Sequence, residues 1–476
     1  MHLESTSPCF LNINLTWGAF RIIVESYFCT MIKKIRILTI SFVVPFLYCR
    51  AQDTAKHDSL KLPFAIAKEK RLSDDDLKEK KEGVYLTGEP DLSFDAEHGF
   101  GAGAEAQLFF NGKHNDPFFA YTPYRAQIDL DAFYTTGGEK EFELIWDIPY
   151  IFNSKWRVRG ICDFEIDPDH LFFGVTENSL KPLSYYPGGD TAKGLTTTNN
   201  FNNYTNNQVA NYNTFQQEEK SIEMSVEHSW FKGKLRTLLG FEYAAYNTTT
   251  PLDNASLLYE QALEGLITGY GMSKTTHLQF GITYDTRDLE DDPSSGTYAE
   301  ITDEFSSTAL GSGFNYNRTF IHYNYYHRLF KGVFKKLVFA GRIGMGYTTG
   351  NAPFYEYLDQ WTSQGDIDGL GGPMVLRGYT ESRFAAPAMA LANIELRYRF
   401  WQVSFWEQNL NFYAIPFFDA GGVWNTLVRV PSNLQNMRYS GGPGAQIAWN
   451  EDTILRFDFG VSPEGSQFYF GIGQIF

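Results

Sequence analysis

Residues 388–400 of the 476-residue chain read AMALANIELRYRF and alternate between an apolar and a mainly polar face. One face carries Ala388, Ala390, Ala392, Ile394, Leu396, Tyr398 and Phe400. The other face carries Met389, Leu391, Asn393, Glu395, Arg397 and Arg399. Because successive side chains of a strand point to opposite sides, this period of two predicts a β-strand with lipid on one side and water on the other.

The same alternation recurs between turn signals along most of the chain, for example at 234–246 and 409–422. We expect about sixteen strands, with boundaries accurate to a few residues. They lie near 90–95, 99–111, 120–134, 140–151, 154–165, 212–230, 234–248, 274–288, 296–308, 314–330, 335–349, 388–400, 409–424, 436–449, 452–462 and 466–476. The pattern predicts an all-β fold, a membrane-spanning antiparallel β-barrel.

The connections support this count of strands. Long connections at 166–211, 250–273 and 350–387 fall on one side of such a barrel, and tight turns at Lys232-Gly233 and Lys331-Gly332 fall on the other. Bacterial barrels show this asymmetry, with long loops outside and short turns in the periplasm. A soluble β-sandwich alternates similarly. Strand length argues against it, because many runs reach the roughly 9–11 residues that a tilted membrane strand needs.

Composition agrees with a barrel and excludes some partners. Aromatic residues make up 17% of the chain, yet its mean hydropathy is −0.31. Beyond the leader no run of about 18 or more apolar residues occurs, so the sequence offers no transmembrane helix. The net charge of −16, without a basic stripe, argues against a nucleic-acid partner.

The N-terminal region predicts export. Met31 begins a short basic segment, residues 37–48 are apolar, and Ala51 places a small residue at the cleavage site. Lipidation of Cys49 is the alternative, which the large Tyr48 before it disfavours. We therefore expect an atypical or mis-called extension at 1–30, a signal peptide at 31–51, a short charged periplasmic segment at 52–89 and the barrel at 90–476.

Short motifs in the second half of the chain carry a resemblance to a known family. They are Leu376-Arg377-Gly378-Tyr379, similar to Val-Arg-Gly-Phe; Phe417-Phe418-Asp419-Ala420-Gly421, matching Phe-x-Asp-x-Gly; and the ending Phe468–Phe476, FYFGIGQIF. The segment Tyr284–Asp288, with Pro293 and Gly296, also looks like a periplasmic hairpin of that family. From about 270 onward the chain resembles the BamA-type superfamily, or bacterial surface antigens, which are outer-membrane insertases and translocators with sixteen-stranded barrels.

The resemblance implies that the loop carrying Arg377 folds into the barrel, where its guanidinium needs a charge-assisted partner. Asp419 would supply this partner, with Glu395 nearby, and Gly378 would let the loop pack closely. The implied loop anchor comprises Arg377, Gly378, Tyr379, Glu395, Phe417, Asp419 and Gly421. The implied assembly signal comprises Phe468, Phe470, Ile472 and Phe476. The alternative is a solvated loop arginine and an unrelated aspartate.

The resemblance further implies a role in inserting or translocating protein or lipid at the outer membrane of a Gram-negative bacterium. The implied partners are outer-membrane lipid, client outer-membrane or secreted proteins, and the barrel-assembly machinery. Typical members carry periplasmic POTRA domains, whereas the segment 52–89 is too short for one. The chain thus resembles a member without them, which puts the delivery of substrates in doubt.

Two other functions stay open. A passive or gated pore is the main alternative, because sixteen strands can enclose a water-filled channel. A barrel enzyme such as a lipid hydrolase is less favoured, because the sequence has no Gly-x-Ser-x-Gly elbow. His98, His228, His277, His322 and His327 are scattered, so we expect no metal site, and we expect no cofactor or catalytic residue.

Overall fold

The computed structural model describes residues 61–67, 70–72, 77, 80–95, 98–184, 197–198, 211–251, 256–289, 292–405, 408–430, 434–449 and 453–476. The predicted extension at 1–30 and signal peptide at 31–51 lie outside these residues. Among the helices of the described part, none is both long and apolar enough to cross a membrane.

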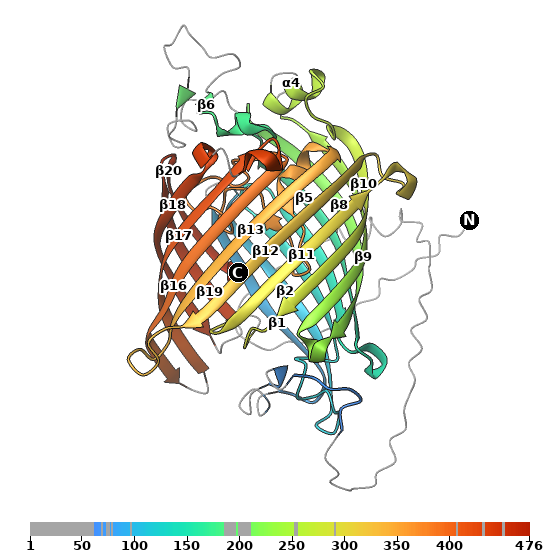
Figure 1. Ribbon diagram of the computed structural model, residues 1–476, viewed down its shortest axis with the longest axis vertical. Coiled ribbons are helices and arrows are strands. Elements are labelled where there is room, and N and C mark those ends of the chain that lie inside the picture. Colours follow the sequence, from blue (N-terminus) through green and yellow to red (C-terminus); the bar gives the residue numbers. More distant parts are fainter. Residues whose placement is uncertain are drawn as a thin grey trace, which may run out of the picture. The chain divides into compact units, whose positions relative to one another are not determined.

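Sixteen antiparallel strands form a closed barrel, which confirms the predicted fold (Figure 1). The strands are β1 (Gly83–Asp95), β2 (Gly99–Gly112), β3 (Ala126–Thr135), β4 (Lys140–Ile148), β5 (Trp156–Leu171), β8 (Thr214–Trp230), β9 (Leu235–Thr249), β10 (Gly271–Asp285), β11 (Gly296–Ser306), β12 (Asn315–Arg328), β13 (Leu337–Asn351), β16 (Ala388–Phe405), β17 (Gln408–Trp424), β18 (Arg438–Trp449), β19 (Thr453–Ser462) and β20 (Gly465–Ile472). Each pairs with its sequence neighbours in this order, and β1 meets β20 to close the barrel.

The alternation that predicted the strands decides which side of the wall each residue faces. On β16 the apolar Ile394 and Phe400 are 43% and 56% exposed, whereas Glu395 and Arg397 are 2% and 1% exposed. Apolar side chains therefore point outward and charged ones into the lumen. This is the inverse of a soluble sheet, and it removes the β-sandwich alternative, because only lipid makes such an outer face stable.

Several strand ends differ from the sequence prediction: β3 begins six residues later, β5 and β16 end six and five residues later, and the two strands that close the barrel differ as well. β1 begins at Gly83 instead of 90, and its pairing with β2 runs from Gly83 to Asp95. Gly88 and Pro90 interrupt the sequence signal, yet proline is tolerated where a strand has an unpaired edge. At the other end, β20 stops at Ile472 instead of 476. Gly473 adopts a φ of +91°, a left-handed conformation that ends the strand.

Longer connections gather at one end of the barrel, together with α4 (Leu257–Leu263) and the small sheet of β6 (Leu183–Ser184) and β7 (Thr197–Thr198) (Figure 1). From the same end the connection 352–387 folds into the lumen, carrying β14 (Asp359–Gln360) and β15 (Ile367–Asp368). We call this connection the lumen loop. Its apolar side chains form a buried core with those of the barrel wall, comprising Phe320, Leu370, Val375, Leu376, Tyr379, Phe384, Ala386, Met389, Leu391 and Val423.

The segment before β1 contacts the opposite end of the barrel. The amide of Ala67 donates to the carbonyl of Lys232 at 2.8 Å, and Lys70 Nζ lies 2.9 Å from the carboxylate of Asp285. The Phe64 ring packs 5.5 Å from that of Phe118, in the connection between β2 and β3. The described residues of this segment are thus joined to the short turns of the barrel.

Candidate functional site

Arg377, near the end of the lumen loop, is 1% exposed and lies against the wall formed by β16, β17 and β19. Its Nε and Nη2 donate to the two carboxylate oxygens of Asp419 at 2.8 and 2.9 Å, and its Nη1 donates to Glu395 at 2.9 Å. Its guanidinium also stacks over the ring of Phe417, 3.4 Å from the centroid. A bidentate contact of this kind fixes both the position and the orientation of the guanidinium.

Further charges continue from this contact. Glu395 accepts from Arg397 at 2.9 Å, while Asp458 lies 3.0 Å from Arg456 and 3.6 Å from Arg377. The arginine cluster therefore comprises Arg377, Arg397 and Arg456 with Glu395, Asp419 and Asp458. Its charges balance, which a buried ionic group requires if it is not to cost stability.

Gly378 brings the loop backbone against β19 and β20. Its amide donates to the Tyr469 hydroxyl at 3.0 Å, and its carbonyl accepts from Ser462 at 2.6 Å. Its φ is +91°, and a Cβ there would lie 2.8 Å from the carbonyl carbon of Gly460. Tyr379 is 1% exposed and packs on Phe384, with ring centroids 5.2 Å apart.

Gly378→Ala is expected to lower the free energy of unfolding of the barrel more than the same substitution at a glycine with free space around it. Gly332→Ala is the control, because Gly332 has a φ of +101° and a Cβ there would meet nothing within 4 Å. The control should lose only about 1–2 kcal/mol of unfolding free energy, which is the cost of placing an L side chain in the left-handed conformation. Gly378→Ala should lose about 1–3 kcal/mol more through overpacking. Urea unfolding in detergent measures both, and equal losses would contradict the close approach.

The remaining implied anchor residue, Gly421, lies on β17 opposite Leu391 of β16. A Cβ there would meet the Leu370 side chain of the lumen loop, so only glycine leaves room for this packing. The structure thus brings together all seven residues that the resemblance implied for the loop anchor.

The implied assembly-signal residues are divided between two environments. Phe468 and Ile472 face outward from β20, 45% and 38% exposed, and Phe470 is the register partner of Phe94 on β1. Phe476 instead lies in the lumen, where Arg397 donates to its backbone oxygen at 3.0 Å. Arg342 donates to the Ile475 carbonyl at 3.2 Å. The Phe476 ring lies 5.0 Å from the Arg342 guanidinium and 5.2 Å from that of Arg397.

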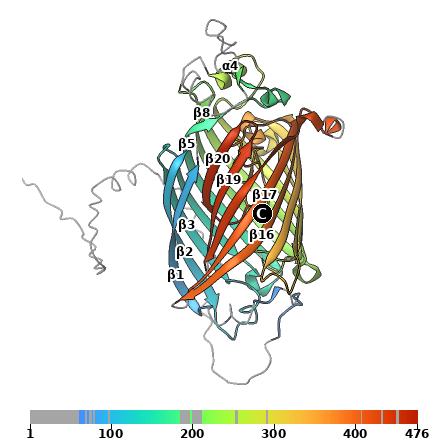
Figure 2. The ribbon, with the colours of Figure 1, turned by 90° about the vertical axis from the view of Figure 1, so that its left-hand side faces the viewer.

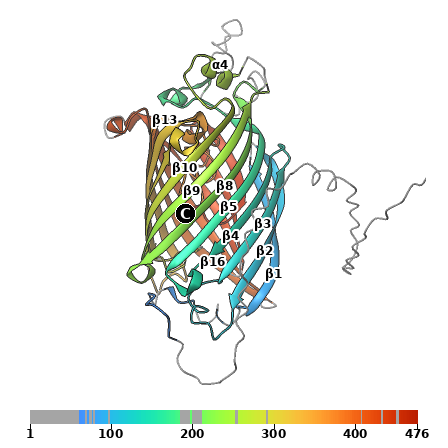
Figure 3. The same cartoon turned by 90° about the vertical axis from the view of Figure 1, so that its right-hand side faces the viewer.

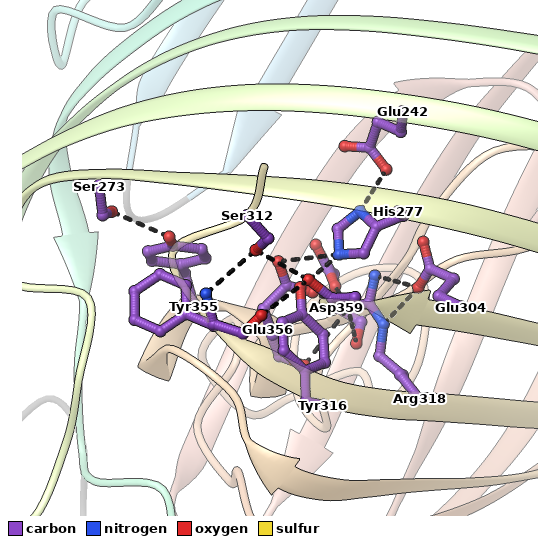
Figure 4. A network of polar contacts seen from close by, with 12 residues as sticks. Glu242, Ser273, His277, Glu304, Ser312, Tyr316, Arg318, Tyr355, Glu356 and Asp359 are labelled. Carbon is purple, nitrogen blue, oxygen red and sulfur yellow. Dashed lines mark hydrogen bonds and ion pairs between the residues drawn. The ribbon is translucent and has the colours of Figure 1, made fainter. Parts of the chain in front are cut away.

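A second network, which sequence reasoning missed, holds the other end of the lumen loop (Figure 4). Arg318 of β12 lies 2.5 Å from Glu304 and 3.3 Å from Glu356, and it also pairs with Asp359. His277 of β10 contacts Glu242 at 3.0 Å and the Tyr316 hydroxyl. The His277 network is the set Glu242, His277, Glu304, Tyr316, Arg318, Glu356 and Asp359. Charged residues at lumen-facing positions of β10–β12 were the sequence signal for this network. Nothing in the sequence indicated that they contact the lumen loop.

A cavity of about 610 Å³ remains beside the loop. Carboxylates on β4, β5, β8 and β9 line it: Glu141, Glu143, Asp163, Glu165, Glu219, Glu223 and Glu242. Arg159 and Arg318 are the arginines among the lining residues. Figure 3 faces the outer side of β5, β8 and β9. The free volume of the lumen is therefore strongly acidic and favours cations.

A closed sixteen-stranded barrel with an apolar outer face, and with a loop bound inside by arginine–carboxylate pairs, defines an outer-membrane β-barrel of a Gram-negative bacterium. Residues 126–476 match the Omp85 superfamily domain, and residues 62–125 match a domain of unknown function (DUF5982). The chain belongs to the Omp85 superfamily. The superfamily includes the BamA-type barrels that the sequence motifs resemble, so that prediction is confirmed.

The first of two similar solved structures agrees with this assignment at the level of the fold. BamA from Haemophilus ducreyi lacking POTRA domains 1–3 is 15% identical, with a TM-score of 0.52 covering 82% of this chain and 70% of that one. CdiB from Escherichia coli is 11% identical, with a TM-score of 0.49 covering 82% of this chain and 62% of that one. None of the curated proteins compared with the chain matches it in sequence.

Proposed function

We propose that this barrel assists the insertion of client proteins into the outer membrane, or their translocation across it. Membership of the Omp85 superfamily supports the class of function. The observation that carries the proposal is the seam between the first and last strands (Figure 2). In the described part of the chain, β1 pairs with β20 through one residue pair, Phe94 and Phe470, whereas its pairing with β2 runs from Gly83 to Asp95.

A nearly unpaired edge has a direct physical consequence in a membrane. Backbone amides and carbonyls without partners cost several kcal/mol each in hydrocarbon, so the edge of β1 gains stability from any strand that pairs with it. A client segment in extended conformation can supply that strand by β-augmentation. The inward turn at Gly473 shortens β20 and leaves the β1 edge without its neighbour over most of its length.

The function is tested by closing the seam. Phe94→Cys with Phe470→Cys, in a background with Cys9, Cys29, Cys49 and Cys162 replaced by serine, should form a disulfide between register partners. Client levels in the outer membrane should fall to those of a depleted strain under oxidising conditions and recover on reduction. The control joins β1 to β2 through Phe94→Cys and Phe100→Cys, which are also register partners. Normal client levels with the β1–β20 bond formed would reject the proposal.

A gated pore is the second candidate, and the acidic cavity favours it. A pore should select cations, because carboxylates dominate the free volume of the lumen. The seam disulfide distinguishes the two functions, because it leaves the lumen unchanged. A pore keeps its conductance in planar bilayers after cross-linking, whereas an insertase loses its effect on clients.

A further inference from the structure

Two histidines far apart in the sequence meet at the loop end of the barrel. His98 lies in the turn between β1 and β2, and its Nε2 is 3.1 Å from Oδ2 of Asp167 on β5. His170 Nδ1 lies 3.1 Å from the same oxygen. A carboxylate oxygen of Glu165 lies within 4.8 Å of the ligand atoms of both Asp167 and His170. We call these four residues the rim cluster.

The surroundings of the rim cluster are acidic and partly enclosed. All four residues line a cavity of about 500 Å³ together with Glu139 and Glu141. Asp167 is 1% exposed and is oriented by the backbone amide of Asp169, which donates to its Oδ1 at 2.8 Å. His170 is held by stacking on Phe215, with ring centroids 4.9 Å apart. The carboxylate and one imidazole are thus positioned by contacts that leave Asp167 Oδ2 and His170 Nδ1 directed at each other.

Glu165, Asp167 and His170 each offer one ligand atom, and these three atoms lie within 4.8 Å of one another, a spacing from which small side-chain rotations can bring them around one transition-metal ion. Ligand atoms about 2.0–2.2 Å from an ion, at tetrahedral or octahedral angles, lie about 3–3.5 Å from one another. Asp167 Oδ2 and His170 Nδ1 are 3.1 Å apart, whereas the 3.1 Å contact of His98 Nε2 with the same oxygen is a hydrogen bond from outside this group. Imidazole nitrogen with carboxylate oxygen suits Zn²⁺ and its neighbours, whereas Mg²⁺ and Ca²⁺ prefer oxygen alone. A divalent cation would also offset the repulsion among the clustered carboxylates.

We propose that His170 Nδ1, Asp167 Oδ2 and the Glu165 carboxylate bind one divalent transition-metal ion of the Zn²⁺ class, and that His98 orients the Asp167 carboxylate through its hydrogen bond. The ion would bind at the end of β5, and the hydrogen bond between His98 and its ligand Asp167 would couple it to the turn after β1, four strands along the wall. Phe94, the seam residue of β1, is four positions before His98. Metal binding would therefore hold the loop end of β1 in place. This inference does not rest on the proposed function.

The test uses the untagged full-length protein in detergent, with Cys162→Ser to remove the thiol of β5. After treatment with EDTA, the barrel should bind one Zn²⁺ per chain by elemental analysis, and Co²⁺ should give visible absorption of a nitrogen–oxygen site. Zn²⁺ should raise the temperature of the heat shift on gels, because a ligand of the folded state stabilises that state. Mg²⁺ should not.

His170→Ala and Asp167→Asn should each abolish stoichiometric binding and the stabilisation by Zn²⁺, whereas His98→Ala should weaken binding by about 10–100-fold. His228→Ala is the matched control, because His228 packs edge-on against Trp156 and at a tilt against Trp230, away from the rim cluster. Gel mobility before heating verifies that each variant is folded, and Asp167→Asn keeps the shape of the side chain. Absence of stoichiometric binding in the parent, or parental binding by His170→Ala and Asp167→Asn, would overturn the proposal.

Discussion

Arg377→Ala is expected to lower the free energy of unfolding of the barrel by about 3–5 kcal/mol, the range for one broken partner of a buried ion pair. The change strands Asp419 and removes a contact of Glu395, both of which are almost fully buried. Asp419→Ala should cause a loss of similar size, because it strands the guanidinium instead. The double variant should lose much less than the sum of the two, which is the signature of direct coupling.

Urea unfolding in detergent measures this cycle. Arg429→Ala is the control, because the pair of Arg429 with Glu177 is solvent-exposed and spans 3.5 Å. Such surface pairs contribute only about 0–1 kcal/mol. If the loss of unfolding free energy in the double variant equals the sum of the two single losses, the pair has no direct role in holding the loop.

The same variants also test function. Release of the loop from β16 and β17 should reduce client insertion while the barrel still assembles, because the strand pairing does not involve Arg377. A gated pore predicts another result, namely higher conductance of the loop variants with unchanged client levels. Single-channel recording and comparison of outer-membrane protein content separate the two.

Removal of residues 473–476 is expected to reduce the amount of assembled barrel strongly and to destabilise what remains by about 3 kcal/mol or more. The tail supplies carbonyl acceptors to Arg342 and Arg397, and its Phe476 ring lies beside both guanidinium groups. Without the tail, two buried cations lose acceptors in the lumen. Phe476→Leu keeps the backbone acceptors and should lose only the ring contribution, about 1–2 kcal/mol in total.

Two roles of this tail can be told apart. If Phe476 acts only as an assembly signal, the truncated protein should reach low levels in cells but show parental stability after refolding from urea into detergent. If the tail holds the lumen side chains together, stability of the refolded protein should fall as well. Parental levels and parental stability of the truncated barrel would contradict both roles.

The strands were predictable because the outer face of a membrane barrel has one strict requirement. Lipid allows only apolar side chains there, so a period of two persists along β16 and β17 and predicts which of their side chains face outward. The predicted strand ends were less accurate where glycine or proline residues interrupt the alternation. Pro90 and Gly88 concealed the start of β1, and Gly473 ended β20 before the last aromatic residue.

The candidate site was predictable only where a motif joined distant residues. Arg377 and Asp419 could be paired because the resemblance placed both in one lumen. No such motif connects Arg318 with Glu356, or His98 with Asp167, and none places Phe476 beside Arg342. Each of these contacts bridges strands or loops far apart in the chain.

The sequence by itself therefore determined the barrel, its number of strands and which side chains face inward. Those features depend on local alternation and on the solvent at each face. Apart from the contact of Arg377 with Asp419 and Glu395, which the resemblance implied, only the tertiary structure decided which lumen residues meet, namely the rest of the arginine cluster, the His277 network and the rim cluster. Any polar residue is tolerated at a lumen-facing position, so the alternation predicts that a charged side chain lies inside the barrel. It does not predict which opposite charge that side chain pairs with. That choice is made when the lumen loop and the C-terminal tail fold into the barrel and bring opposite charges together.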